Sequence, residues 1–312
     1  MENKLYVSSS PHLSSNASTR RIMLDVIIAL LPTSVAACII FGMRSLVLIG
    51  VCVASCVLCE YIARKIMKRD TTIGDLSAVV TGLLLALNLP VNINPLIAVF
   101  GCIVAIVAVK QLFGGIGMNF VNPALAARIV LLVSFPNDMM TYPKAFFYKE
   151  GVDALTSATP LSDIGSYSYI ELFLGKCPGC IGEVCAAALI LGGIYLVIRK
   201  VISPVIPVVY VGVAALMTLV VGGDPLYQIL SGGLLLGAIF MATDYTTSPI
   251  TFSGKIIFAA GCGILTILLR TYSNMPEGVS FSILLMNVLV PHIENLTTPK
   301  SLGTVKKAKG EK

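Results

Sequence analysis

The run MLDVIIALLPTSVAACIIF, residues 23–41, decides the fold class of this chain. Apart from Asp25 and a few hydroxyl residues it is apolar, and it is long enough to cross a bilayer, which takes about 20 mostly apolar residues. A polar segment and the pair Arg20-Arg21 precede it, whereas a secretory signal peptide places its apolar core nearer the start and a small-residue cleavage site after it. We therefore expect a retained membrane helix.

The composition of the whole chain is that of a membrane protein. Hydrophobic residues make up 56% of the sequence and charged residues 12%, and the mean hydropathy is +0.90. Soluble domains are about 45–50% apolar and about 25% charged. The net charge of +6 therefore says little about acidic substrates, and we expect no nucleic-acid partner. The composition predicts an all-α integral membrane protein embedded in the lipid bilayer.

Apolar segments recur along the chain, separated by short polar or basic stretches. They predict about ten transmembrane helices. Several segments are short or interrupted by glycine, and small residues such as Gly82 and Gly192 allow neighbouring helices to approach closely. The expected helices lie near residues 23–41, 46–63, 74–88, 94–110, 122–135, 180–198, 204–221, 227–243, 254–270 and 279–296.

The basic residues predict the orientation of these helices, because cytoplasmic loops of membrane proteins are enriched in lysine and arginine. If the N-terminus is inside, most of the basic residues fall on the cytoplasmic side, among them Arg64, Lys65, Lys68 and the lysines of the C-terminal tail. We therefore expect both termini to be cytoplasmic and the long polar loop 136–179 to face outside.

Two weak internal similarities predict that the chain has two related halves. Residues 81–87 resemble 232–238, and residues 117–120 resemble 278–281. Five helices in each half would make the second an inverted copy of the first, as in many transport folds. We expect a cytoplasmic segment, a first five-helix repeat, an extracytoplasmic loop, a second five-helix repeat and a basic cytoplasmic tail, at residues 1–22, 23–135, 136–179, 180–298 and 299–312.

The segment Asp153-Ala-Leu-Thr156-Ser157-Ala158-Thr159 lies in the long polar loop. One interpretation is a plain turn, because serine and threonine side chains bend loops by hydrogen bonding to nearby backbone. The other is a modification site, because the segment resembles the D-x-x-[ST]-[GAS]-A-T motif on which a dedicated transferase attaches FMN through a phosphoester. This resemblance implies Thr159 as the attachment residue and Asp153, Thr156, Ser157 and Ala158 as the rest of the attachment motif.

Four stretches that together span nearly all of the chain resemble one known family. They are residues 110–128, 153–161, 175–183 and 237–249. They resemble the RnfD component of the Rnf complex, the ion-translocating ferredoxin:NAD oxidoreductase, and more distantly the NqrB component of the sodium-pumping NADH:quinone reductase.

The resemblance implies a subunit of a translocase in the inner or plasma membrane of a bacterium. It implies that the subunit carries electrons through covalent FMN, coupling their transfer to Na⁺ or H⁺ movement. The other Rnf subunits would be its partners, and the flavin transferase a transient one. The sequence has no G-x-G-x-x-G turn after a strand and no iron–sulfur cysteine run, so we expect the NAD and ferredoxin sites on partner subunits.

Three further polar residues are candidate binding residues, each with a structural alternative. Asn122 precedes Pro123, which is typical of a helix N-cap followed by proline at the first helical position. Asn119 and Asn122 could instead bind a second, non-covalent flavin, since the quinone-reductase relatives carry riboflavin and amides can hydrogen-bond an isoalloxazine edge. Asp244 could serve such a site, because carboxylates near the membrane are commonly functional, or it could cap its helix or pair with Lys255.

The remaining motifs leave the function open between two classes. Cys177-Pro-Gly-Cys180 could be a disulfide or half of a metal site, although the family resemblance requires only the Pro-Gly, and we expect neither metal ligands nor catalytic acid–base residues. An inverted five-helix repeat by itself would equally suit a solute channel or transporter without a redox role. Covalent flavin on the purified chain would distinguish the two classes.

Overall fold

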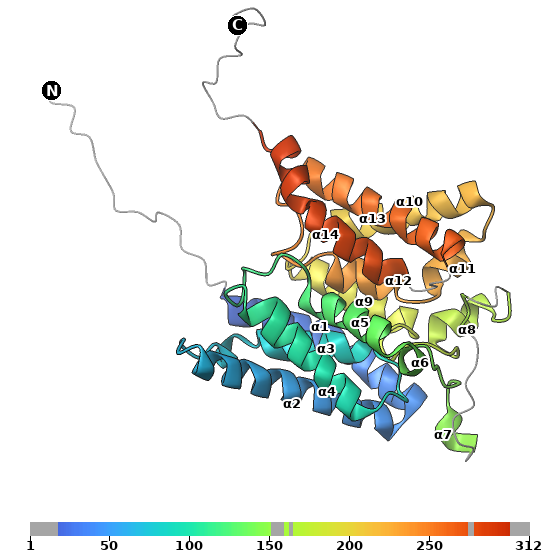
Figure 1. Ribbon diagram of the computed structural model, residues 1–312. Coiled ribbons are helices and arrows are strands. Elements are labelled where there is room, and N and C mark those ends of the chain that lie inside the picture. Colours follow the sequence, from blue (N-terminus) through green and yellow to red (C-terminus); the bar gives the residue numbers. More distant parts are fainter. Residues whose placement is uncertain (1–17, 151–158, 162–164, 274–277, 300–312) are drawn as a thin grey trace, which may run out of the picture.

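The computed structural model describes residues 18–150, 159–161, 165–273 and 278–299, and their regular secondary structure is helical (Figure 1). This confirms the expected all-α membrane class. The first half of the chain forms α1 (Thr19–Phe41), α2 (Met43–Ile66), the short 3₁₀ helix η1 (Ile73–Asp75), α3 (Ser77–Leu87), α4 (Pro95–Ile103), which continues as the π-helical segment η2 (Val104–Gln111), and α5 (Pro123–Ser134).

The described part of the connecting region carries short helices, and the second half resumes with longer ones. The short helices are α6 (Pro136–Met139), α7 (Phe147–Glu150) and α8 (Tyr169–Leu174). The second half contains α9 (Ala186–Ile198), α10 (Val205–Val221), α11 (Pro225–Leu230), α12 (Leu234–Leu236), its π-helical continuation η3 (Gly237–Met241), α13 (Phe252–Tyr272) and α14 (Gly278–Thr297).

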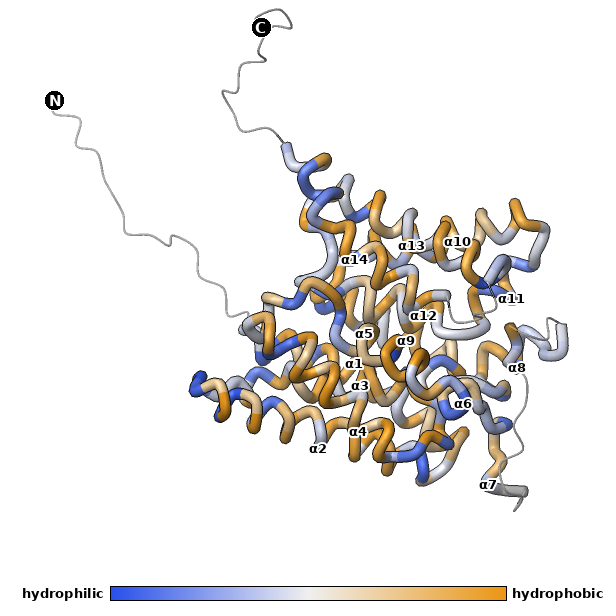
Figure 2. Tube along the Cα trace, viewed as in Figure 1, coloured by the Kyte–Doolittle hydropathy of each residue, from blue (hydrophilic) through white to orange (hydrophobic). Residues whose placement is uncertain are grey.

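Four of these helices, α1, α2, α13 and α14, are long and apolar enough to cross a membrane. The other apolar helices are shorter and lie at Ser77–Leu87, Pro95–Gln111, Pro123–Ser134, Ala186–Ile198 and Val205–Val221. Hydrophobic residues occur along most of the helices (Figure 2), and large apolar side chains such as Ile39, Val208 and Val220 are exposed. Exposed apolar surface of this kind is suited to contact with lipid.

The segment expected to form one helix at 227–243 is divided into α11, α12 and η3. The break has a local cause, because Gly232 adopts a left-handed φ of +67° between α11 and α12. Only glycine enters that region at little cost. The preceding helix α11 begins at its own cap, since the Asp224 side chain accepts a hydrogen bond from the Leu226 backbone.

Glycines allow the closest helix contacts, as the sequence predicts. A Cβ added to Gly82 of α3 would lie 2.9 Å from the Cys52 carbonyl oxygen of α2. A Cβ on Gly192 of α9 would collide with the Ala29 carbonyl of α1. Any larger side chain at either position would therefore push helices apart in a tightly packed interior. Through the contact at Gly192 the second half packs directly on the first (Figure 1).

Candidate functional site

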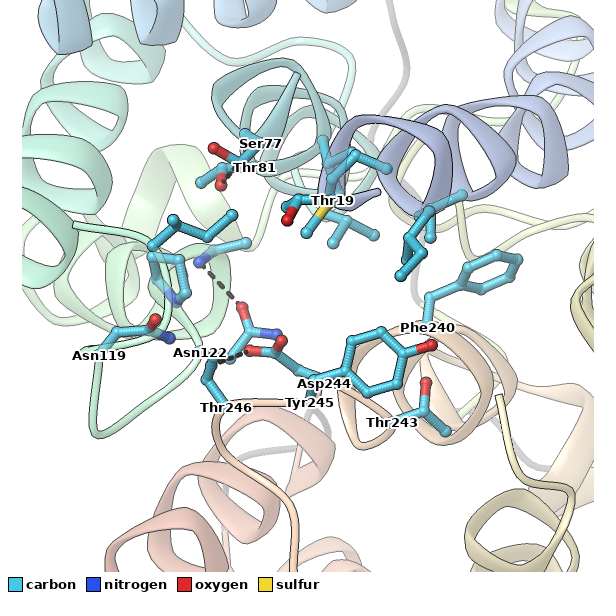
Figure 3. Close-up of a pocket in the computed structure, with 18 of the residues that line it drawn as sticks. Thr19, Ser77, Thr81, Asn119, Asn122, Phe240, Thr243, Asp244, Tyr245 and Thr246 are labelled. Carbon is cyan, nitrogen blue, oxygen red and sulfur yellow. Dashed lines mark hydrogen bonds between the residues drawn. The ribbon is translucent and has the colours of Figure 1, made fainter. Parts of the chain in front are cut away.

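One large cavity brings together the three polar residues that the sequence analysis selected. It has a volume of about 410 Å³, within the range of ~300–1,000 Å³ that is usual for ligand pockets. Asn119 and Asn122, from the loop between η2 and α5, lie on one side with Asp244, which follows η3 (Figure 3). Ser77 and Thr81 of α3 face them across the open space.

The walls of this cavity differ in chemistry. Polar groups line the part near Asn122 and Asp244, whereas α1 contributes the apolar side chains Ile22, Met23 and Val26 and η3 contributes Phe240. The π-helical segment η2 ends beside the cavity, and η3 lies against it. Such segments interrupt α-helices frequently at functional sites. The cavity therefore suits a ligand with both apolar surface and a polar edge.

Asn122 is the N-cap of α5, which confirms the structural interpretation made from the sequence. Its backbone is extended, and its side-chain oxygen accepts hydrogen bonds from the backbone amides of Ala124 at 3.0 Å and Leu125 at 3.5 Å. Pro123 occupies the first helical position. The side-chain nitrogen of Asn122 donates to the Met241 carbonyl oxygen at 3.4 Å, which ties α5 to η3.

The Asn122→Ala variant distinguishes two roles of Asn122, capping α5 and binding a ligand in the cavity. Loss of the cap should lower the free energy of unfolding by about 0.5–2 kcal/mol. If Asn122 also binds a flavin, the variant should lose non-covalent flavin on purification while retaining covalent flavin, as measured by extraction and intact mass. Asn94→Ala is the matched control, because Asn94 caps α4 in the same way outside the cavity. Unchanged flavin content with reduced stability in both variants would leave Asn122 with the cap role alone.

Asp244 is partly buried at the end of η3, and burial raises the pKa of its carboxyl above the ordinary value. Its oxygen accepts hydrogen bonds from the hydroxyls of Thr246 at 3.1 Å and Thr247 at 3.3 Å, which favour the charged form and oppose the shift. The ion pairs seen among the described residues do not join Asp244 to Lys255, so the suggested pair is wrong. A carboxyl of this kind can accept or donate a hydrogen bond.

A buried charge cluster adjoins the same cavity and was not singled out from the sequence. Lys110 lines the cavity, and its ammonium group donates to Glu60 at 2.9 Å and to Ser77 at 2.7 Å. Gln111 donates to the same carboxylate at 3.1 Å, and Thr72 does so at 2.6 Å. The available signal was Glu60 itself, a carboxylate in an apolar helix, since buried carboxylates are expensive and are usually paired.

Thr159 lies at a narrow cleft on a different part of the molecule. The cleft has a volume of about 20 Å³, and Thr159 lines it together with Arg128, Glu183, Gly232 and Gly233. Thr159 is partly buried and therefore keeps part of its surface exposed. The rest of the motif, Asp153, Thr156, Ser157 and Ala158, lies outside the described residues, so the structure gives the position of the last threonine only.

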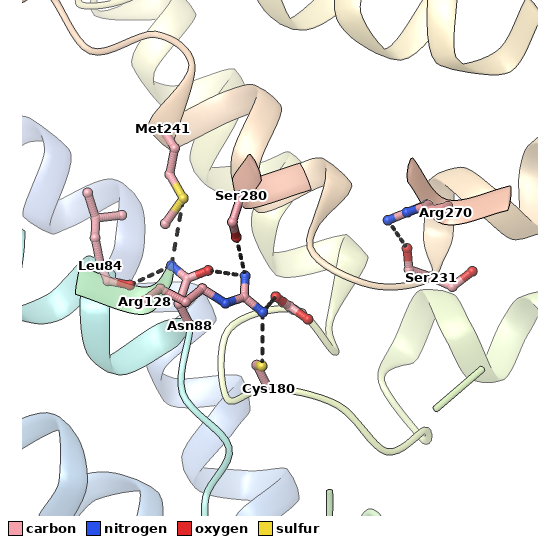
Figure 4. A network of polar contacts seen from close by, with 9 residues as sticks. Leu84, Asn88, Arg128, Cys180, Ser231, Met241, Arg270 and Ser280 are labelled. Atoms are coloured by element: carbon pink, nitrogen blue, oxygen red, sulfur yellow. Dashed lines mark hydrogen bonds and ion pairs between the residues drawn. The ribbon is translucent and has the colours of Figure 1, made fainter. Parts of the chain in front are cut away.

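Arg128 beside this cleft is the centre of a buried polar network (Figure 4). Its guanidinium forms an ion pair with Glu183 at 3.0 Å, with side chains only 3% and 5% exposed. It also donates to Asn88 at 2.9 Å, to Ser280 at 3.0 Å and to the Cys180 sulfur at 3.5 Å. Glu183 lies just before the start of α9. Its arginine partner comes from a helix far away in the sequence.

Met241 connects this network to the large cavity. Asn88, which accepts from Arg128, donates through its side-chain nitrogen to the Met241 sulfur at 3.7 Å. Asn122 donates to the carbonyl oxygen of the same residue at 3.4 Å. The cleft at Thr159 and the cavity at Asn122 are therefore joined by a short chain of buried contacts through Asn88 and Met241.

Cys177 and Cys180 are both buried, and no disulfide joins them in the part of the chain that the structure describes. Cys180 instead lies against Arg128. Within the described ranges, no cluster of three or more cysteine, histidine or carboxylate side chains is arranged to hold a metal ion. The pair therefore contributes to the packing around the buried ion pair.

The chain matches a known protein family along most of its length. The model of the NQR2, RnfD, RnfE family matches residues 6–303. The chain belongs to this family. Since the match covers both halves and the loop between them, the cavity at Asn122 and the cleft at Thr159 both lie inside the family's region.

Several relatives match nearly the full length of the chain. It is 48% identical to the D subunit of the Na⁺-translocating ferredoxin:NAD⁺ oxidoreductase complex of Acetobacterium woodii, over 98% of this chain and 97% of that protein. It is 40% identical to the D subunit of the proton-translocating complex of Clostridium ljungdahlii, over 97% of each. The D subunit of the ion-translocating oxidoreductase complex of Stutzerimonas stutzeri is 38% identical, over 92% and 93%.

Proposed function

We propose that this chain is the membrane-embedded D subunit of an ion-translocating ferredoxin:NAD oxidoreductase complex and that it carries electrons through FMN bound covalently to Thr159. The family and the names of its full-length relatives support the assignment to such a complex. The observation that carries the flavin proposal is the position of Thr159, the last residue of the attachment motif, at a partly open cleft beside Arg128 and Glu183.

Thr159 suits covalent attachment in its chemistry and its accessibility. Its hydroxyl oxygen would attack the flavin-side phosphorus of a flavin dinucleotide held by the transferase. The bond between the two phosphates of that donor would break, and the nucleoside monophosphate and the hydroxyl proton would leave. The chain would then gain the mass of FMN less one water. A separate transferase must reach this hydroxyl, which a partly exposed loop permits and a helix interior would prevent. The preceding residues Asp153, Thr156, Ser157 and Ala158 would be recognised by that transferase. When bound, FMN supplies the ability to take up and release electrons.

The cavity at Asn122 would hold a second, non-covalent flavin such as riboflavin. Its polar residues, Asn119, Asn122 and Asp244, offer hydrogen bonds to the polar edge of an isoalloxazine ring. Met23 and Phe240 offer apolar contacts to its faces. The volume of about 410 Å³ is sufficient for a ligand of moderate size.

The two halves would be inverted five-helix repeats. In such an arrangement a pseudo-two-fold axis brings equivalent helices together. The contacts of α1 with α9 and of α5 with α14 support the proposal, because each pair would join the same helix of the two repeats. The eighth helix of the proposed set is the broken segment α11, α12 and η3.

Both termini would be cytoplasmic, in the plasma membrane of a bacterium, with the loop bearing Thr159 outside. The distribution of basic residues supports this orientation. Cysteine labelling in intact cells should then reach introduced cysteines at residues 140–175 but not at 244–254. Labelling of both regions from the same side would overturn the orientation and the inverted repeat.

The other Rnf subunits would be the permanent partners, and NAD and ferredoxin would bind to them. Relatives are named as translocating Na⁺ in one organism and protons in another, so the proposal extends to either ion. A channel or transporter without a redox role is the alternative function. Intact mass and in-gel flavin fluorescence of the purified chain, produced together with its transferase, test the choice. A colourless chain with the mass of the bare polypeptide would favour the alternative.

A further inference from the structure

An apolar groove lies between α9 and α10. It has a volume of about 270 Å³, and the residues that line it are isoleucine, valine, glycine or proline. Ile194 of α9 is 51% exposed and Val208 of α10 is 68% exposed, so both walls of the groove are accessible from outside the chain. Because its walls are aliphatic, the groove is suited to a hydrocarbon ligand.

The groove exists because the two helices pack on different partners. α9 packs on α1, whereas α10 packs on α13, and both contact η3, whose Ile239 lines the groove. The α9 wall runs from Ile190 to Ile198, a stretch over which the helix rises about 12 Å. One leaflet of a bilayer contains about 15 Å of hydrocarbon, half of the ~30 Å core. The groove therefore has the length of an acyl chain within one leaflet.

The turn between α9 and α10 places a positive charge at one end of the groove. Lys200 is exposed, with a left-handed φ of +57°, and it lies two residues from both Ile198 and Ile202, which line the groove. Two residues of chain span at most about 7 Å. The hydroxyl of Tyr245 donates to the Val201 backbone oxygen and holds the turn, and its ring is exposed. Tyrosine is enriched at the membrane–water interface, so the turn suits the level of the lipid headgroups.

Lys200 is the basic residue of this turn that is not engaged by a carboxylate. Arg199 pairs with Asp25 at 3.2 Å, whereas Lys200 takes part in none of the ion pairs among the described residues. A lysine ammonium group is a compact point charge that binds phosphate. Basic residues near the membrane surface attract anionic lipids. A groove suited to hydrocarbon thus ends at a charge suited to a phosphate.

We propose that this groove binds an anionic membrane phospholipid, with one acyl chain between α9 and α10 and the phosphate at Lys200. The inference goes beyond the proposed function, because the site requires neither flavin nor a path for electrons. Ile202 also lines the large cavity at Asn122, so the acyl chain lies against a residue that forms part of the cavity wall. A zwitterionic lipid suits the site less well, because its headgroup adds a positive charge next to Lys200.

A single introduced tryptophan tests the groove, because the chain contains no tryptophan of its own. Val208→Trp places the reporter at the groove, one turn from the start of α10. Ile62→Trp is its control, because Ile62 is exposed one turn from the end of α2 and does not line the groove. The full chain is reconstituted in phosphatidylcholine with a small proportion of phosphatidylglycerol that carries brominated acyl chains. Bromine quenches tryptophan on contact, so quenching measures how much phosphatidylglycerol gathers at each reporter.

Quenching of Val208→Trp should be several times that of Ile62→Trp. Adding Lys200→Gln should reduce it to the level of Ile62→Trp, whereas adding Lys68→Gln should leave it unchanged. Lys68 is the matched control, because it is exposed just after α2 with a left-handed φ of +53°, as Lys200 is just after α9.

Three results would overturn the proposal. The first is equal quenching at the two reporters. The second is equal quenching of Val208→Trp by brominated phosphatidylcholine and brominated phosphatidylglycerol at the same proportion, because the headgroup would then have no part in binding. The third is the loss of quenching by either lipid at Val208→Trp in the assembled complex, which would show that a partner subunit fills the groove.

Native mass spectrometry of the full chain without a reporter provides a second measurement should Val208→Trp not accumulate. Phosphatidylglycerol should bind Lys200→Gln about fivefold more weakly than the unmutated chain, which corresponds to ~1 kcal/mol, the attraction of one lysine near a lipid surface. Lys68→Gln should bind the lipid as the unmutated chain does. Equal affinities of Lys200→Gln and Lys68→Gln would show that Lys200 does not hold the phosphate, and the proposal would be wrong.

Discussion

Thr159→Val is expected to remove covalent flavin from this chain completely. Valine keeps the branched side chain of threonine but has no hydroxyl oxygen to form the phosphoester. Intact mass should fall to that of the bare polypeptide with its substitution, and electron transfer through the complex should stop. Folding should be almost unaffected, because Thr159 is only partly buried in a loop and such surface substitutions usually change stability by less than about 0.5 kcal/mol.

Two further variants make this result specific. Thr141→Val removes a hydroxyl from the same expected outer loop and should retain the full flavin mass, since Thr141 lies outside the attachment motif. Thr159→Ser keeps a hydroxyl and should retain part of the modification. Covalent flavin that persists in Thr159→Val would move the linkage to Thr156 or Ser157. If the unmutated chain carries no covalent flavin, the proposed redox function is wrong.

Arg128→Leu should be the most destabilising substitution in the membrane interior. Removing the arginine leaves the Glu183 carboxylate buried without its ion-pair partner, and breaking a buried pair in this way typically costs about 3–5 kcal/mol. It also removes the donors to Asn88 and Ser280. Thermal unfolding of the purified chain in detergent should show a large fall in the midpoint, and yield should fall with it.

Arg199→Leu is the matched control, because Arg199 also pairs with a carboxylate, Asp25 at 3.2 Å, but its side chain is 44% exposed. Water screens a pair with one exposed partner, and Tyr195 also donates to Asp25 at 3.0 Å, so the loss of stability should be smaller than for Arg128→Leu. Adding Glu183→Gln to Arg128→Leu should recover part of the lost stability, since it removes the uncompensated charge. Equal midpoints for Arg128→Leu and Arg199→Leu would show that the buried pair does not stabilise the contact between the two halves.

Several features of the site were predictable because they depend on neighbouring residues alone. The cap at Asn122 is an example, since an asparagine followed by proline satisfies its own helix start wherever that helix lies. Gly82 and Gly192 were predicted to permit close helix contacts, and the structure shows α2 and α1 against them. The prediction of one continuous helix at 227–243 was wrong. The sequence showed that the segment is apolar, but it did not show that Gly232 adopts a left-handed φ and divides the segment.

The sequence by itself determined the membrane class, the family and the candidate attachment threonine, because hydropathy, capping and linear motifs are properties of adjacent residues. Tertiary structure alone decided which distant residues meet. Glu183 forms an ion pair with Arg128, and Lys110 forms one with Glu60. Asp244 and Asn122 line the same cavity. The physical reason is that a buried charge requires a partner but does not specify which one. The packing of helices from both halves determines which residue becomes the partner.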